Sequence, residues 1–293
     1  MTRVYVEGVG LLAPGLQGWA AAAPVLAGST PYAAAPTEIP VTTLLPAAER
    51  RRAGLPVKLV LAVGQEAFTN AARDPGTTAT VFTSSSGDGE VLHNICETLA
   101  SAEREISPTR FHNSVHNAPA GYWSIAVGAR EASTSLCGRD SSFAVGLIDA
   151  VAQAATEKAA VALIACDQPY PEPLNTARHI AASVAIGIVF TPQATERSLG
   201  ALDITLEEGA GQSVMDNAEL EALRLGVPSA RGLPLLAALA RGVEATVDLE
   251  YTGTLRLVAR VSPVSAEDRL VADALLGATA PAVSGAALAP TPA

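Results

Sequence analysis

Residues 133–165 read STSLCGRDSSFAVGLIDAVAQAATEKAAVALIA, and this stretch decides the fold class. A short β-prone run at Ser133–Cys137 precedes an amphipathic helical pattern from about Ser142 to Thr156, and an apolar strand pattern follows at Ala160–Ala165. Two consecutive strands joined by a helix form a βαβ unit. The stretch therefore predicts an α/β sheet with at least some parallel pairing.

Alternating strand and helix patterns extend outward from this unit in both directions. Toward the N-terminus we expect a strand at 3–7, a glycine turn at 8–10, helices at 18–27 and 57–72, an irregular excursion at 28–46, a strand at 78–85, and helices at 90–103 and 117–128 separated by a loop. Toward the C-terminus we expect strands at 183–190 and 201–208, two short helices, a hairpin turning near 251–254, a last helix after about 265, and a disordered tail at 278–293.

The composition restricts the function classes. The chain has 293 residues and a formal net charge of −10, which argues against a general nucleic-acid binder. Its only lysines are Lys58 and Lys158, so a basic patch for an acidic ligand must be built mainly from arginine. The three cysteines contain no CxxC pair, and we see no signal peptide or membrane-spanning run. We expect a soluble, cytoplasmic protein without a disulfide framework or zinc site.

Several local motifs suggest chemistry that their surroundings do not support. The segment GVGLLA at 8–13 matches a dinucleotide fingerprint, but Pro14–Gly15 interrupts the helix that would receive the pyrophosphate. The loop at 84–89 lacks the lysine of a P-loop.

His112 and His116 have a metal-ligand spacing, yet no partner carboxylate motif accompanies them, so we expect no metal and no cofactor. No GxSxG elbow is present, which leaves Cys137 as the candidate nucleophile or a small buried apolar residue.

Three segments in the first 170 residues carry a resemblance to a known family. They are the start RVYVEGVGLLAPG, the segment ISPTRFHNSVHNAPAGYWSIAVG at 106–128, and SLCGRDSSFAVGLIDA at 135–150 with the following AVALIACDQP. In order and spacing they resemble the N-terminal half of β-ketoacyl synthases. The resemblance implies a thiolase-like mixed sheet covered by helices, with the C-terminal half truncated or divergent. It places a synthase-like domain at 1–265, divergent from 171 onward, and a helix and partly disordered tail at 266–293.

The nucleophile position of this family is expected to be degenerate here. Counted without gaps from the NAPAG motif at 117–121, the family's catalytic cysteine falls on Asp140, and Cys137 lies three residues upstream. An aspartate cannot form the acyl thioester that condensation requires. The family also uses two histidines from its C-terminal half, and this chain has no histidine after His179. We therefore expect no condensing activity from the chain alone.

A relative that keeps the fold and lacks the nucleophile resembles a chain-length factor. Such subunits pair with an active synthase in type II polyketide systems, and this sequence is most similar to the short chain-length-factor-like proteins of aryl polyene pathways. The resemblance implies that the strand at 133–137 pairs with its counterpart across a heterodimer and that the loop around Arg110 and Phe111 reaches toward the partner's acyl pocket. The predicted channel or interface residues are Arg110, Phe111, His112, His116, Tyr122, Trp123, Ser133, Thr134, Ser135, Leu136 and Cys137.

Two alternatives remain open from the sequence. One is an atypical ketoacyl synthase or acyltransferase that uses Cys137, and the other is a homodimeric acyl-binding scaffold. The aromatic cluster at 111–123 is equally compatible with ordinary core or interface packing. Because this chain is acidic, we expect an acyl carrier protein to dock mainly on the partner, with at most a contribution from Arg50, Arg51 and Arg52.

Overall fold

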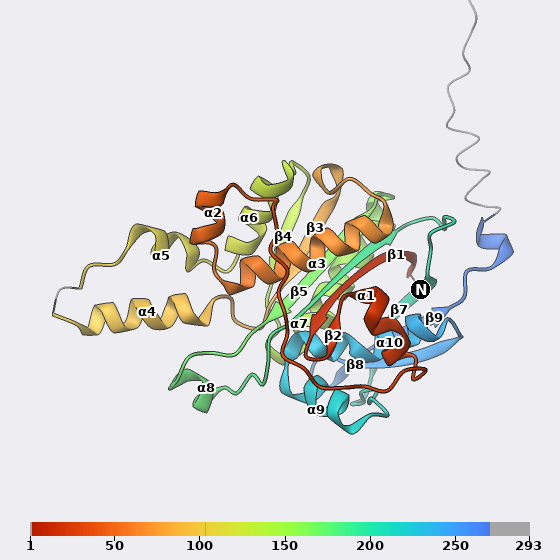
Figure 1. Cartoon of the computed structure of the whole chain (residues 1–293). Helices are drawn as coiled ribbons and strands as arrows, with labels where there is room; N and C mark the ends of the chain where they lie inside the picture. Colours follow the sequence, from red (N-terminus) through yellow and green to blue (C-terminus); the bar gives the residue numbers. More distant parts are fainter. Residues whose placement is uncertain (1, 103, 270–293) are drawn as a thin grey trace, which may run out of the picture.

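The computed structural model describes residues 2–102 and 104–269. A single nine-stranded sheet forms its centre, with the strand order β4-β3-β5-β6-β1-β7-β9-β8 and the short β2 paired to β1 (Figure 1). The predicted tail and most of the last predicted helix lie outside the described residues, although 266–269 are helical. The strands are β1 (Thr2–Ala13), β2 (Leu16–Gln17), β3 (Ala79–Thr83), β4 (Ser133–Leu136), β5 (Val161–Asp167), β6 (Val184–Thr191), β7 (Gly200–Glu208), β8 (Ala245–Glu250) and β9 (Leu255–Ser262).

Ten α-helices are described alongside three 3-10 turns. They are α1 (Trp19–Leu26), α2 (Ala47–Arg52), α3 (Leu55–Ala71), α4 (Gly89–Ala100), α5 (Pro108–Asn113), α6 (Ala118–Val127), α7 (Ser142–Glu157), α8 (Leu174–Ala177), α9 (Ala218–Gly226) and α10 (Leu233–Arg241), and the turns are η1 (Pro75–Thr77), η2 (Arg139–Ser141) and η3 (Pro228–Gly232). Within the described ranges, no helix is both long enough and apolar enough to cross a membrane.

The pairing of strands confirms the predicted βαβ unit. The strand β3 pairs in parallel with both β4 and β5, and α7 connects β4 to β5. The remaining pairs, from β5 to β6 onward, are antiparallel, and the hairpin β8–β9 confirms the turn predicted near residues 251–254. The sheet is therefore mixed, with its parallel part at the end where the predicted site lies.

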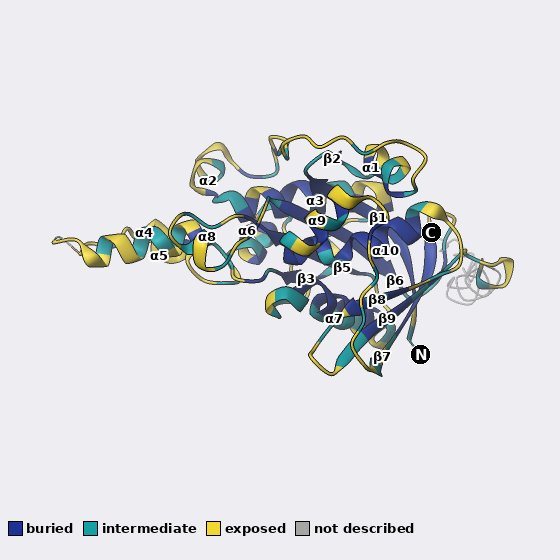
Figure 2. Ribbon diagram, turned by 90° about the horizontal axis from the view of Figure 1, so that it is seen from below, coloured by how far each residue is buried: buried dark blue, intermediate teal, exposed yellow. Residues whose placement is uncertain are grey.

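Helices cover both faces of the sheet. On one face α7, α1, α9 and α10 pack over a core that includes Phe143, Leu163 and Ile188. On the other face α3 and α6 pack over a second core that includes Leu61, Trp123 and Ile164. Leu163 and Ile164 are neighbours on β5 and belong to opposite cores, because successive side chains of a strand point to opposite faces. The sheet is thus buried on both sides (Figure 2).

The glycine turn predicted at residues 8–10 is wrong, because β1 runs unbroken from Thr2 to Ala13. A Cβ on Gly8 would lie 2.1 Å from the carbonyl oxygen of Ala67, and one on Gly10 would lie 2.1 Å from that of Val63. Both carbonyls belong to α3. These glycines let the helix backbone approach the sheet closely, and this close packing explains the sequence pattern that resembles a dinucleotide fingerprint.

The loop predicted between the helices at 90–103 and 117–128 is also wrong in part, since residues 108–113 form α5. Pro108 occupies the first turn of this helix, where its missing N–H costs nothing and its fixed φ favours helix. With α4, this helix forms an arm that projects from one end of the molecule in both views (Figures 1 and 2). The predicted irregular excursion at 28–46 is confirmed.

Candidate functional site

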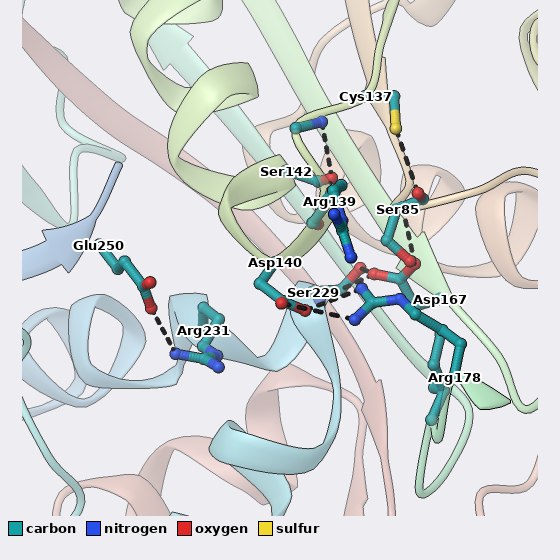
Figure 3. A network of polar contacts seen from close by, with 12 residues as sticks. Ser85, Cys137, Arg139, Asp140, Ser142, Asp167, Arg178, Ser229, Arg231 and Glu250 are labelled. Carbon is teal, nitrogen blue, oxygen red and sulfur yellow. Dashed lines mark hydrogen bonds and ion pairs between the residues drawn. The ribbon is translucent and has the colours of Figure 1, made fainter. Parts of the chain in front are cut away.

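The predicted nucleophile elbow is the sharp connection from β4 to α7 (Figure 3). Arg139 has φ of 53°, a left-handed conformation that is costly for a residue with a side chain. Ser142 supports this turn, because its hydroxyl accepts a hydrogen bond from the Gly138 N–H at 3.0 Å and donates one to the Arg139 carbonyl at 2.7 Å. The elbow is therefore a turn that side-chain hydrogen bonds hold in place directly before the largely buried helix α7.

Asp140 of the elbow is held in an ion pair. The Nη2 atom of Arg178, the residue after α8, donates to Asp140 Oδ1 at 2.8 Å, and its Nη1 lies 3.4 Å from Oδ2 (Figure 3). Arg178 is the main cause that holds the pKa of Asp140 below its ordinary value, and Arg231 and Arg139 contribute smaller effects. A carboxylate that is ionised and engaged in this way offers neither a thiolate nor a free base at the predicted nucleophile position.

Cys137 lies just beyond the end of β4 and is exposed. Its Sγ atom donates a hydrogen bond to the carbonyl oxygen of Ser85 at 3.1 Å (Figure 3). Thiol catalysis requires a nearby base or positive field that produces the thiolate. The contact that the structure gives to this sulfur is instead with a carbonyl oxygen, which is neither a base nor a positive charge.

A buried carboxylate beneath the elbow was missed by the sequence reasoning. Asp167, the last residue of β5, accepts four hydrogen bonds, from the N–H and hydroxyl of Ser85 and from the N–H and hydroxyl of Ser229, at 2.5 to 2.8 Å. Burial raises its pKa, and these four bonds oppose that effect. Asp167 thus ties the loop after β3 to the turn η3 and fixes the surroundings of the elbow. The sequence does contain a signal for this site, because Asp167 is the single charged residue at the end of an otherwise apolar strand.

The predicted aromatic cluster is divided between the surface and the core. Phe111 and His112 are exposed on α5, as is Arg110, while Tyr122 is buried and its ring meets that of His112 edge-on at 6.5 Å. Phe111, His112 and Tyr122 help to line an apolar surface hollow of about 460 Å³. Phe111, His112 and Tyr122 are therefore the predicted channel residues that the structure brings together in one hollow.

The other two predicted aromatic residues have different surroundings. Trp123 is fully buried and stacks on Phe68 of α3 with ring centroids 5.5 Å apart. The ring of His116 lies beside Ser84, with its Nε2 atom 3.4 Å from the backbone oxygen and 3.5 Å from the hydroxyl. His112 and His116 therefore contact different neighbours and do not face a common point.

The predicted interface strand β4, with Ser133, Thr134, Ser135 and Leu136, is an edge of the sheet. The Ala132 carbonyl accepts from Thr80 N–H and the Leu136 carbonyl accepts from Ser84 N–H, so the even-numbered residues bond toward β3. By the alternation of a parallel ladder, the backbone groups of Ser133 and Ser135 point away from the sheet. This edge is available to receive another strand.

Solved structures with the same fold include subunits of ketosynthase complexes. One is a ketosynthase (ApeO) in complex with its chain length factor (ApeC) from Xenorhabdus doucetiae, at 21% identity and a TM-score of 0.67, covering 89% of this chain and 99% of that chain. Another is AntDE:AntF, a type II PKS acyl-carrier protein in complex with its ketosynthase, at 11% identity and a TM-score of 0.71, covering 90% and 99%. A third is the ishigamide ketosynthase/chain length factor, at 15% identity and a TM-score of 0.65, covering 90% of this chain and 100% of that chain.

Sequence comparison gives the family directly. None of the curated proteins matches the sequence. The model of the β-ketoacyl synthase N-terminal domain matches residues 19–233, which include α1 through η3 and the whole elbow. That match spans most of the chain and agrees with the structural similarity. The protein therefore belongs to the β-ketoacyl synthase N-terminal domain family.

Proposed function

We propose that this protein is a noncatalytic, chain-length-factor-like subunit that pairs with an active β-ketoacyl synthase. The observation that carries the proposal is the ion pair between Asp140 and Arg178 at the elbow, where the motif count predicts the family's nucleophile. The carboxylate cannot accept an acyl group as a thioester. The chain retains the architecture of a synthase without its chemistry.

The surface near the elbow supports a role in shaping the partner's acyl channel. The edge strand β4 leaves the backbone groups of Ser133 and Ser135 unpaired within the described sheet. The helix α6 contacts this strand and exposes Ile125, which is 66% exposed and lines the apolar hollow together with Phe111 of α5, which is 65% exposed. Exposed apolar side chains beside an open sheet edge are typical of an interface. In this proposal the partner's strand pairs with β4 and the apolar hollow contacts the end of the growing chain.

The proposed setting is a type II polyketide or fatty-acid pathway in the cytoplasm, with aryl polyene synthesis as the first choice. The sequence supports a reducing compartment, because its three cysteines are odd in number and contain no CxxC pair. Similar structures include a ketosynthase bound to its chain length factor, and another contains an acyl-carrier protein. We place the carrier mainly on the partner subunit, because both this chain and carriers of this type are acidic.

Co-expression with candidate ketosynthases tests the pairing. We expect a stable complex with wild type and with Ser135→Ala, which keeps the backbone N–H. Ser135→Pro removes an outward-pointing N–H while the β3-facing bonds of Thr134 and Leu136 remain, so it should weaken the complex at least tenfold. Circular dichroism and the unfolding midpoint of the isolated variant check that it folds. A wild-type chain that stays monomeric, or self-associates and leaves the synthase's products unchanged, contradicts the proposal.

The noncatalytic assignment has a separate test. Incubation of the full chain with an acyl-carrier-protein thioester should give no covalent adduct by intact mass, because the Cys137 thiol donates to a carbonyl. An adduct that disappears in Cys137→Ala, but persists in Cys96→Ala as the matched exposed cysteine, would instead identify an atypical synthase or acyltransferase.

A further inference from the structure

A partly enclosed cavity lies on the side of α3 away from the elbow loop, beneath the irregular segment that joins α1 to α2. In Figure 2 this segment runs along the outside of α3. The cavity has a volume of about 320 Å³, at the lower end of the range of small-molecule sites. Its walls are mainly apolar. Ile39 and Val41 come from the irregular segment, Ala53 directly follows α2, and Leu61 lies on α3.

Two cations stand at this apolar cavity. Arg50 of α2 and Lys58 of α3 both line it, and neither forms an ion pair with a carboxylate within the described residues. The Nη1 atom of Arg50 donates to the Thr42 carbonyl at 3.3 Å, which holds the covering segment to α2 and leaves the other guanidinium donors free. By contrast, the neighbouring Arg52 is paired with Glu49 at 3.1 Å. In a chain with a formal net charge of −10, two unpaired cations beside one apolar cavity are a distinctive local arrangement.

We propose that this cavity binds a linear aliphatic anion, with the chain against Ile39, Ala53 and Leu61 and the head group between Arg50 and Lys58. An apolar wall favours the alkyl chain through burial of its surface, and a single anionic head group satisfies the two cations. A neutral alcohol has no charge to attract Arg50 and Lys58, and an alkylammonium ion is repelled by these two cations. The shared chemistry fits either a carboxylate or a phosphate head group. The site is distinct from the elbow and does not depend on the proposed partner.

Isothermal titration of the full chain with decanoate and with decyl phosphate tests the site and separates the two head groups. We expect saturable 1:1 binding of at least one of them, and binding of decanol and decylammonium at least tenfold weaker. Arg50→Gln and Lys58→Gln should each reduce the affinity about three- to tenfold, because each removes one charge contact. Val41→Asp should also reduce it, and since Val41 is 86% exposed the change leaves folding intact.

Arg51→Gln is the matched control, because Arg51 is exposed on the same helix and does not line the cavity. It removes the same charge and should leave the affinity within twofold of wild type. Binding by only decanoate or only decyl phosphate supports the site and identifies its head group. Equal binding of decanol, an equal loss in Arg51→Gln and Arg50→Gln, or no saturable binding below the micelle concentration overturns the proposal. None of these measurements uses the partner synthase, so their failure is separate from failure of the proposed function.

Discussion

At the scale of single residues, the ion pair between Asp140 and Arg178 defines the elbow. Its two side chains are 46% and 31% exposed, so solvent screens the interaction and we expect it to contribute only about 0.5 kcal/mol to the free energy of unfolding. Arg178→Gln should remove this contribution near neutral pH. Urea unfolding of wild type and variant measures the difference.

The contribution of this pair depends on pH in a defined direction. Because the pKa of Asp140 is held below its ordinary value of 3.8, the stabilisation is fully present above that value and is lost as the pH falls through the lower, folded-state pKa. A double-mutant cycle with Asp140→Asn and Arg178→Gln should therefore give a coupling energy that is constant from about pH 5 to pH 8 and declines only below about pH 4. A coupling that instead disappears near neutral pH contradicts the assigned pairing.

The residue scale also shows what the sequence can and cannot predict about the site. The motif count places Asp140 at the start of a helix that follows a short strand, and the structure agrees with that placement. The partner Arg178 lies 38 residues further along, in an irregular segment with no periodic pattern, so only the folded sheet brings the two together. The four hydrogen bonds of Asp167 depend on Ser85 and Ser229, which are still further apart in the sequence.

At the scale of elements, α3 packs closely against β1 because Gly8 and Gly10 of that strand have no side chains. Gly8→Ala or Gly10→Ala would place a Cβ against the helix backbone, which cannot move without separating α3 from the sheet. We expect each to lower the free energy of unfolding by about 3 kcal/mol or more. Gly121→Ala on α6 is the control, because nothing lies within 4 Å of its added Cβ, and it should stabilise by about 0.5 to 1 kcal/mol. Equal effects in denaturant unfolding would show that close packing is not the reason for these glycines.

The order of elements was predictable because the strand and helix periods differ clearly in the buried segments. The strands β3, β5 and β6 and the helices α3 and α7 all lie where the hydrophobic pattern predicts them. The errors have local causes. Glycines at 8–10 are typical of turns, yet here they serve a long-range contact, and the proline and asparagine residues around α5 are typical of loops, yet Pro108 begins a short helix.

At the scale of the whole molecule, the charge distribution bears on carrier docking. The exposed Arg51 and Arg52 are the basic residues of α2 that do not line the cavity. If the carrier docks mainly on the partner, Arg51→Glu combined with Arg52→Glu should leave turnover of the reconstituted complex within about twofold of wild type. Turnover is measured against carrier concentration, with Arg50 left unchanged because of its place at the cavity. A large rise in the KM for the carrier would place the docking surface on this subunit.

The position of β1 in the sheet has a consequence for synthesis of the chain. Residues 2–13 are synthesised well before their pairing partners on β6 and β7, which are residues 185–191 and 200–204. At about 5 to 20 residues per second, this apolar strand waits roughly 10 to 40 s for its neighbours. During that interval its unpaired edges are exposed to aggregation and to chaperones. A strand that is made early is thus paired late, and translation speed sets how long the nascent chain stays vulnerable.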